Sequence, residues 1–307
     1  MITSFSRIVF AFIFIGTVLI ACKKKDDTEP TATAIQVTST DYQPTNTSNR
    51  KLSIKSFEVG DITTVPEEGE NKIWDLSAYA SASSQVSVIQ NNPVPSSSSF
   101  STATFVRTGP SEFLSDFTYN QYYEVSEQGY FKVGVKIDAG DAQLQGATVT
   151  SEGEDASIEP AQMILKFPLN YQDATSRESV LIEKYTLTAV PFGITNAPVE
   201  RRIDFKTSLE VVGWGKVVLP QGAIANNVEV LLVKNTEEFV STYFLNNAPA
   251  PQVLLSALNV SSEPVKYVDY YFVSKEFGII TNIRFDRNDS GAVVTPAITG
   301  VYITKIE

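Results

Sequence analysis

Apolar and polar residues alternate with a period of two through much of this chain, and that period restricts the fold more than any other feature. Between residues 130 and 137, every second side chain is apolar, while Lys132 and Lys136 stand between them. Residues 201–211 repeat the alternation, and residues 228–233 are almost continuously apolar. The first pattern is typical of a strand with one buried face, and the second of a strand buried on both faces.

Further short runs of this kind predict additional strands, separated by Gly, Pro, Asn and Ser turn residues. They lie at 86–90, 102–107, 162–167, 180–190, 216–219, 238–245, 265–274, 279–286 and 300–306. Helical periodicity is confined to residues 251–258. The sequence therefore predicts an all-β fold, mainly an antiparallel β-sandwich over residues 51–307. An acidic stretch at 151–160 leaves open whether two packed β subdomains meet near 155–160 or a loop lies there.

The N-terminus has a different pattern. Residues 8–20 are almost wholly apolar, follow a short segment whose one charge is Arg7, and end just before Cys22, which is the one cysteine of the chain. These are the features of a secretory signal, and the apolar run is shorter than the about 20 residues of a membrane-spanning helix. Lys, Asp, Thr, Ser, Asn and Pro dominate the residues after Cys22, so we expect a flexible tether up to residue 50, in which residues 31–40 could add an edge strand.

The stretch 19–22 (LIAC) resembles the lipobox of bacterial lipoproteins. The resemblance implies a signal peptide at 1–21, cleavage before Cys22, acylation of Cys22, and residence as an outer-membrane lipoprotein facing the surface or the periplasm. The charged residues 23–29 are similar to the export tether of Bacteroidota surface lipoproteins, although an ordinary solvated linker would have the same composition. The alternative for Cys22 itself is an uncleaved signal anchor with an incidental cysteine.

The absence of histidine removes many kinds of chemistry. With no histidine and one cysteine in 307 residues, the chain cannot form a Ser-His-Asp triad, a Cys-His site or a His-ligated zinc site. A net charge of −11 argues against nucleic acid as a partner. We therefore expect no catalytic residues, no cofactor and no metal. Carboxylate chemistry, as in a glycoside hydrolase, remains the alternative for an enzyme.

Two kinds of acidic motif are candidates for chemistry. Carboxylates gather at 67–70, 138–141, 152–155 and 237–238, where we expect turns, strand ends and solvated loops. Residues 286–291 (DRNDSG) match the start of a calcium loop, but Ala297 stands where the loop's bidentate Glu belongs. A hairpin turn is the preferred interpretation of this motif.

One strand carries the candidate ligand-binding residues. In the segment 265–274, Tyr267, Asp269 and Tyr271 share one face. Two tyrosines beside a carboxylate would suit a glycan or a protein partner if that face were open. A strand packed on both faces is the plainer interpretation.

Four blocks resemble, in order, the motifs of a β-rich domain of exported Bacteroidota proteins, a domain that often precedes a type IX secretion sorting tail. They are 69–77 (GENKIWDLS), 122–130 (YYEVSEQGY), 165–171 (LKFPLNY) and 213–222 (GWGKVVLPQG) followed by 227–231 (NVEVL). Leu76 replaces the usual Phe, and the last block lacks the usual Leu-Arg-Val. The resemblance implies an all-β fold and no established activity. Trp74 and Trp214 are expected core anchors, with a sugar platform as the alternative.

Together these observations predict a non-enzymatic lipoprotein of the cell envelope. It would bind an unknown envelope protein or form part of an envelope assembly, held to the membrane by its N-terminal lipid. A glycan-binding accessory lipoprotein is the second hypothesis.

Overall fold

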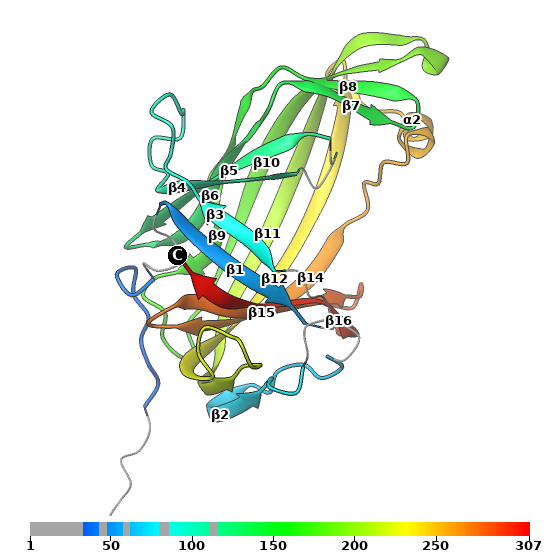
Figure 1. The fold of residues 1–307 in the computed structure, drawn as a ribbon. Helices are drawn as coiled ribbons and strands as arrows, with labels where there is room; N and C mark the ends of the chain where they lie inside the picture. Colours follow the sequence, from blue (N-terminus) through cyan, green and yellow to red (C-terminus); the bar gives the residue numbers. More distant parts are fainter. Residues whose placement is uncertain (1–32, 43–47, 58–61, 80–85, 111–113, 115) are drawn as a thin grey trace, which may run out of the picture. The chain divides into compact units, whose positions relative to one another are not determined.

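The predicted all-β, mainly antiparallel fold is confirmed (Figure 1). The computed structural model describes residues 33–42, 48–57, 62–79, 86–110, 114 and 116–307. The elements are β1 (Arg50–Ser56), β2 (Gly69–Asp75), β3 (Ser87–Asn91), β4 (Phe105–Pro110), β5 (Thr118–Ser126), β6 (Gly129–Ile137), β7 (Gly140–Leu144), β8 (Ala147–Ser151), β9 (Asp155–Lys166), β10 (Ala174–Ala189), the 3-10 helix η2 (Val190–Phe192), β11 (Ile194–Val218), β12 (Asn227–Leu245), β13 (Ala248–Pro249), α2 (Gln252–Ala257), β14 (Val265–Ser274), β15 (Gly278–Arg287) and β16 (Val293–Ile306).

The strands of the unit formed by residues 33–307 belong to one sheet, so the layers expected of a sandwich are facing parts of that sheet. The hydrogen-bonded path runs β3-β1-β16-β15-β14-β12-β11-β10-β9-β6-β5-β4. Its two end strands come together again, because Asn92 and Val106 exchange backbone hydrogen bonds of 2.8 and 2.9 Å. The sheet therefore curves back on itself and has an inner and an outer face.

Two pairs of predicted strands each turn out to be a single long strand. Residues 201–211 and 216–219 fall in or beside β11, which has 25 residues, and 228–233 and 238–245 both lie in β12, which has 19. Gly213 and Gly215 lie at or next to a register shift between Val211 and Gly213. The shift is a bulge, which lets the strand bend without ending.

Three large apolar clusters and one small one, around Phe100 and Tyr122, lie among the described residues. One lies on the inner face around Leu181, Leu187 and Ile203, and a second lies on the same face around Leu209, Leu231 and Val233. A third cluster covers the outer face of β12 and β14, where it includes Val230, Leu232, Val268, Tyr270 and Phe272 under Trp74 of β2. The prediction that 228–233 is buried on both faces is confirmed for Val230–Val233, whereas Val228 is half-buried and Glu229 is exposed.

The resemblance blocks lie side by side in two pairs. β2, from the first block, forms a parallel ladder with β11, from the fourth, in the register Lys216↔Ile73 and Val217↔Trp74. The second block forms the β5–β6 hairpin, and Gly129 pairs with Lys166 of the third block. Motifs that are separate along the chain therefore meet at two places in the sheet.

Part of the expected tether is packed on the sheet. Val37 is fully buried, Tyr42 is 1% exposed, and Val37 exchanges backbone hydrogen bonds with Leu169. The apolar side chains in this otherwise polar stretch explain the difference from the predicted tether over 22–50. Residues 155–160, the candidate boundary, begin strand β9, and residues 33–307 form one compact unit.

The predicted helix at 251–258 is confirmed as the short α2. It buries Leu254 and Leu255, and Pro251 stands at its N-terminal end. Among the residues that the structure describes, no helix has both the length and the apolar character needed to cross a bilayer.

Candidate functional site

A polar cavity of about 240 Å³ lies on the inner face of the sheet. Strands β5, β6, β9, β10, β11, β12, β14 and β15 contribute to its wall. The cavity lies between the two inner apolar clusters. On β12, the cavity residues Asn235 and Glu237 are preceded by Val233 of the second cluster and followed by Phe239, which packs against the first. Its main polar side chains are Gln121, Lys132, Gln162, Asn235, Glu237 and Arg284.

A buried ion pair forms one side of this cavity. Asp269 and Arg284 are direct partners in the β14–β15 register, and the guanidinium donates to both carboxylate oxygens at 2.9 and 2.8 Å. Asp269 is 0% exposed, and the Arg284 guanidinium lies 3.8 Å from the ring centre of Tyr267. Burial alone would lower the pKa of Arg284, but the hydrogen bonds and charge of Asp269 outweigh burial and raise the pKa.

A second carboxyl, that of Glu237, is held by neutral groups. It is 6% exposed and accepts hydrogen bonds from the hydroxyl of Tyr267 at 2.8 Å and from the amide of Gln162. Burial raises its pKa, the hydrogen bond from Tyr267 works against that rise, and the negative charge of Asp269 adds to it. The net shift of the pKa is upward, so Glu237 holds its proton more tightly here than an exposed glutamate does.

Glu183 anchors a separate buried network on the wall formed by β10 and β11. Its carboxylate accepts from Tyr119 at 2.5 Å, from Tyr185 at 3.0 Å and from Arg201 at 3.2 Å. Arg201 also donates to Ser241 on β12. Both carboxylate oxygens are thus satisfied, and the network joins β5, β10, β11 and β12 through side chains.

Two amide oxygens remain without a partner. Among the described residues, the Oδ1 atoms of Asn235 and Asn282 are buried and accept no hydrogen bond. Both flank Tyr271: Asn282 is its register partner on β15, and Asn235 donates from Nδ2 to the Tyr271 hydroxyl at 3.2 Å. A buried acceptor of this kind normally has a partner, so each calls for a donor from outside the described chain.

A second cavity of about 240 Å³ adjoins the first. The two share Tyr123, Ile164 and Tyr271 in their walls. The second one is otherwise lined largely by aliphatic and aromatic side chains, with Arg107 and Asn282 among the polar ones. Tyr271, with the two unpartnered amides on either side, therefore stands at the junction of the two spaces.

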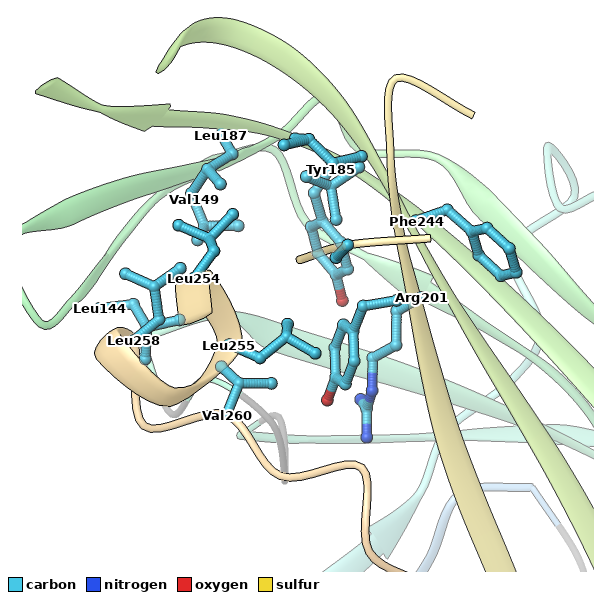
Figure 2. A pocket seen from close by; sticks show the side chains of 14 residues that line it. Leu144, Val149, Tyr185, Leu187, Arg201, Phe244, Leu254, Leu255, Leu258 and Val260 are labelled. Atoms are coloured by element: carbon cyan, nitrogen blue, oxygen red, sulfur yellow. The ribbon is translucent and has the colours of Figure 1, made fainter. Parts of the chain in front are cut away.

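A small apolar pocket of about 40 Å³ lies beyond Arg201, beneath α2. Figure 2 shows Leu254 of the helix, and Leu258 directly after it, turned toward Leu144 and Val149. Arg201 lines both this pocket and the polar cavity. The helix thus covers an apolar end of the space inside the sheet.

The structure brings the three predicted ligand-binding residues together, but on the inner face. Tyr267 and Tyr271 are half-buried and line the polar cavity, and Asp269 lies fully buried behind them in its ion pair. The opposite face of β14 packs in the outer cluster, so this is a strand covered on both faces. Cys22, the predicted lipid site, lies outside the described residues.

The expectation that the carboxylates lie in turns and solvated loops is wrong for Glu237. This residue lies in the middle of β12 and is buried, because it is in phase with Val233 and Phe239 on the inner face. By contrast, Glu67 and Glu68 make exposed ion pairs with Lys72 and Lys234.

The motif at 286–291 covers the last two residues of β15 and the start of the turn into β16. Asn288 Oδ1 accepts hydrogen bonds from the Ser290 hydroxyl at 2.7 Å and from the Ala292 amide at 2.9 Å. These contacts support the hairpin interpretation. Both tryptophans are core residues, with Trp74 6% and Trp214 8% exposed, so neither is an open sugar platform.

Sequence reasoning missed most of the cavity, including Glu183, Arg201, Asn235 and Arg284. A signal was nevertheless present in the phase of the alternation. Arg201 occupies the same parity as Ile203 and Phe205, which the alternation places on the buried face, and Glu183 stands between Leu181 and Tyr185. A charged residue in phase with buried ones marks an inward-facing polar group.

Comparison with known proteins adds little. No protein-family model and no curated protein matches this chain. One solved structure shows similarity, a crystal structure of a predicted exported protein with a YmcC-like fold from Bacteroides fragilis NCTC 9343. It is 8% identical, with a TM-score of 0.27 over 85% of this chain and 97% of that chain. A similarity at this level carries no argument about fold or function.

Proposed function

We propose that this chain is an exported, lipid-anchored binding protein of the cell envelope, and that a small polar ligand binds inside its sheet. The observation that carries the proposal is the charge-bearing lining of the polar cavity. Asp269, Glu237, Glu183, Arg201 and Arg284 all lie at or beside a space of about 240 Å³.

The energetic cost of this lining supports a role in binding. Each buried charge loses its hydration, and a buried ion pair is often no more stabilising than apolar residues of the same volume. Apolar clusters on both sides show that the inner face accepts apolar packing. Polar groups that converge on an open volume are typical of ligand sites.

The location of Tyr267, Asp269 and Tyr271 decides what kind of ligand fits. An extended polysaccharide would need an open face, whereas these residues face an interior cavity. The glycan-accessory hypothesis therefore narrows to a ligand small enough to enter the sheet. Binding as part of an envelope assembly would use the outer surface and is compatible with an occupied interior.

Binding without reaction is supported by how the carboxyl groups are engaged. Asp269 is tied to Arg284, and Glu183 is tied to two tyrosines and an arginine. A carboxylate-based hydrolase would need one carboxyl free to act as nucleophile or base. Hydrolysis of chromogenic glycosides by the purified chain, abolished in Glu237→Gln, would contradict this part of the proposal.

The anchor is tested by replacing its attachment residue. Cys22→Ala should abolish incorporation of labelled fatty acid and move the protein from the membrane fraction to the soluble fraction, because Cys22 offers the one thiol in the chain. Thr28→Ala, six positions further on, is the matched control, and it should leave both the fatty-acid incorporation and the membrane fractionation unchanged. Retention of the label in Cys22→Ala would contradict lipid attachment at this residue.

Binding in the cavity is tested by partly filling the cavity with a larger side chain. Small polar compounds are screened by thermal shift on the full mature chain and on Phe239→Trp, where a larger ring replaces a half-buried cavity side chain. Phe244→Trp is the control, since Phe244 lines the neighbouring apolar pocket (Figure 2) and is not among the residues that line the polar cavity. A compound that stabilises the wild type and the control but not Phe239→Trp supports the proposal. Equal stabilisation of all three would place binding elsewhere and overturn it.

A further inference from the structure

We propose that the cavity takes an uncharged, hydroxyl-rich ligand of about the size of one sugar ring, held beside Tyr271 at Asn235. This inference rests on the proposed binding function and names its ligand class. Three independent features of the cavity carry it: the pairing of both arginines with carboxylates, the unpartnered acceptor of Asn235, and the size.

The two arginines of the cavity are each neutralised by a carboxylate. Arg201 is bonded to Glu183, and Arg284 is bonded to Asp269. Lys132 and Glu237 also line the wall. A charged ligand would have to break one of these pairs or stay uncompensated in a desolvated site. The site therefore favours a neutral ligand.

The unpartnered atoms specify the polarity of the ligand. Asn235 is 3% exposed, lines the cavity, and its Oδ1 accepts no hydrogen bond from any described residue. Asn282, in the wall of the adjoining cavity, also has a buried Oδ1 that accepts no hydrogen bond from any described residue. A ligand hydroxyl that reaches Asn235 Oδ1 from the polar cavity would satisfy this oxygen, whereas Asn282 would be reached only by a ligand that extends into the adjoining cavity.

The remaining polar groups suit a ligand that both donates and accepts. Gln121 accepts from the Tyr123 hydroxyl through Oε1, so its NH₂ group can donate into the cavity. The rings of Tyr123, Tyr267 and Tyr271 supply flat apolar surface beside these polar groups. A sugar ring has this combination of apolar faces and hydroxylated edges.

The volume sets the size of the ligand. About 240 Å³ corresponds to roughly eight water molecules at ~30 Å³ each, and it lies below the ~300–1,000 Å³ of sites for drug-sized ligands. One ring with its hydroxyl groups fits this space. A longer chain of sugars would have to continue past Tyr271 into the adjoining space.

The test measures binding to the full mature chain by calorimetry with three classes of probe. Glucose, galactose and N-acetylglucosamine are the neutral probes, glucose 6-phosphate is the charged probe, and dodecanoate is the apolar probe. We expect binding of at least one neutral sugar, with glucose 6-phosphate about tenfold weaker or more, because Arg201 and Arg284 are already paired with carboxylates.

Two variants tie the binding to the proposed atoms. Asn235→Leu removes the unpartnered oxygen at nearly constant volume and should weaken sugar binding about tenfold or more, because a ligand hydroxyl loses its acceptor. Asn120→Leu is the matched control, since Asn120 bonds Thr108 and Asp138 outside the cavity. Circular dichroism and a thermal melt establish that each variant is folded.

The outcomes separate the two proposals. Sugar binding that survives Asn235→Leu would overturn the ligand position. Binding of dodecanoate or glucose 6-phosphate in place of the neutral sugars would overturn the ligand class but leave the proposed binding function standing. If no compound in these classes or in the small-molecule screen binds the folded wild type, both proposals fail.

Discussion

At the scale of single residues, the inner face is unusual because ionisable groups occupy positions that the strand pattern assigns to the core. Asp269 and Arg284 illustrate the consequence for stability. Each is costly to bury alone, and each is tolerated because the other lies directly across the ladder. Asp269 or Arg284 alone would therefore destabilise the fold, and each is tolerated only when the other is present.

Arg284→Met should destabilise the fold by about 3 kcal/mol, because it leaves the Asp269 carboxylate buried without a counter-charge. Arg202→Met, which breaks an exposed pair with Asp204, is the matched control and should hardly move the urea midpoint. Urea unfolding followed by circular dichroism measures both. The double variant Arg284→Met with Asp269→Leu should recover most of the loss, and no recovery would contradict the pairing explanation.

The raised pKa of Glu237 leads us to expect that the stability of the fold depends on pH. Because burial raises its pKa in the folded state, the folded protein binds the proton more tightly than the unfolded chain does. The stability that this proton contributes is complete below the unfolded-state pKa and is lost as pH rises through the folded-state pKa. Glu237→Gln should therefore be more stable than wild type at high pH and lose that advantage on acidification.

Urea midpoints between about pH 4 and pH 8 measure this effect. Glu238→Gln changes the next residue, on the opposite face of β12, and serves as the control. A Glu237→Gln curve parallel to that of wild type over the whole range would show that the Glu237 proton is not linked to folding.

At the scale of elements, the parallel contact between β2 and β11 depends on the absence of a side chain. A β-carbon at Gly215 would lie 2.0 Å from the carbonyl oxygen of Lys72 and 2.5 Å from its amide nitrogen. Both atoms are backbone, so neither can move aside without shifting β2. Gly215 therefore allows the backbones of the first and fourth resemblance blocks to approach closely.

Gly215→Ala should cost about 1–3 kcal/mol and displace β2 from β11. Trp74 and Trp214, the two tryptophans of the chain, lie in or beside this contact, so their fluorescence should move to longer wavelength as β2 loosens. Gly109→Ala is the control, because a β-carbon at Gly109 meets no described atom within 4 Å. Unchanged fluorescence and stability in Gly215→Ala would contradict close packing at this point.

Most of the elements could be predicted from the sequence, whereas the site could not. Alternation is a local property, so it indicates β6, β11, β12 and β14 directly. Which face of β14 is enclosed depends on strands β5, β6 and β9, about a hundred residues or more away in the chain. Arg201 can lie inside only because its partner, Glu183, comes from another strand. Local patterns do not specify such partners.

At the scale of the whole molecule, the extent of strand pairing differs between parts of the sheet. β11 and β12 pair along almost their whole lengths, but the two ends of the strand path meet at the bridge between Asn92 and Val106. Arg107 reinforces the meeting point by donating to Asn91 at 2.7 Å and stacking on Phe105 and Tyr123. The seam between β3 and β4 is therefore the place where the sheet should open first.

Native-state hydrogen exchange should show this order. The amides of Asn92 and Val106 should exchange through local opening, well before those of Leu231 and Val233 in the centre of β12. Mass spectrometry of exchanged peptides resolves the two regions. Equal protection at the seam and in β12 would mean that the sheet opens only by global unfolding.

The pairing of β1 with β16 also has a consequence for the order in which the protein can be completed. The first strand of the sheet pairs with the last one, and Lys51 and Glu307 exchange backbone hydrogen bonds at the end of this ladder. A chain emerging from a ribosome or a secretion channel with its N-terminus leading must hold β1 unpaired with β16 until that strand arrives. The interior therefore cannot be sealed before the whole sheet has emerged, and a ligand present at that moment could be enclosed as the fold is finished.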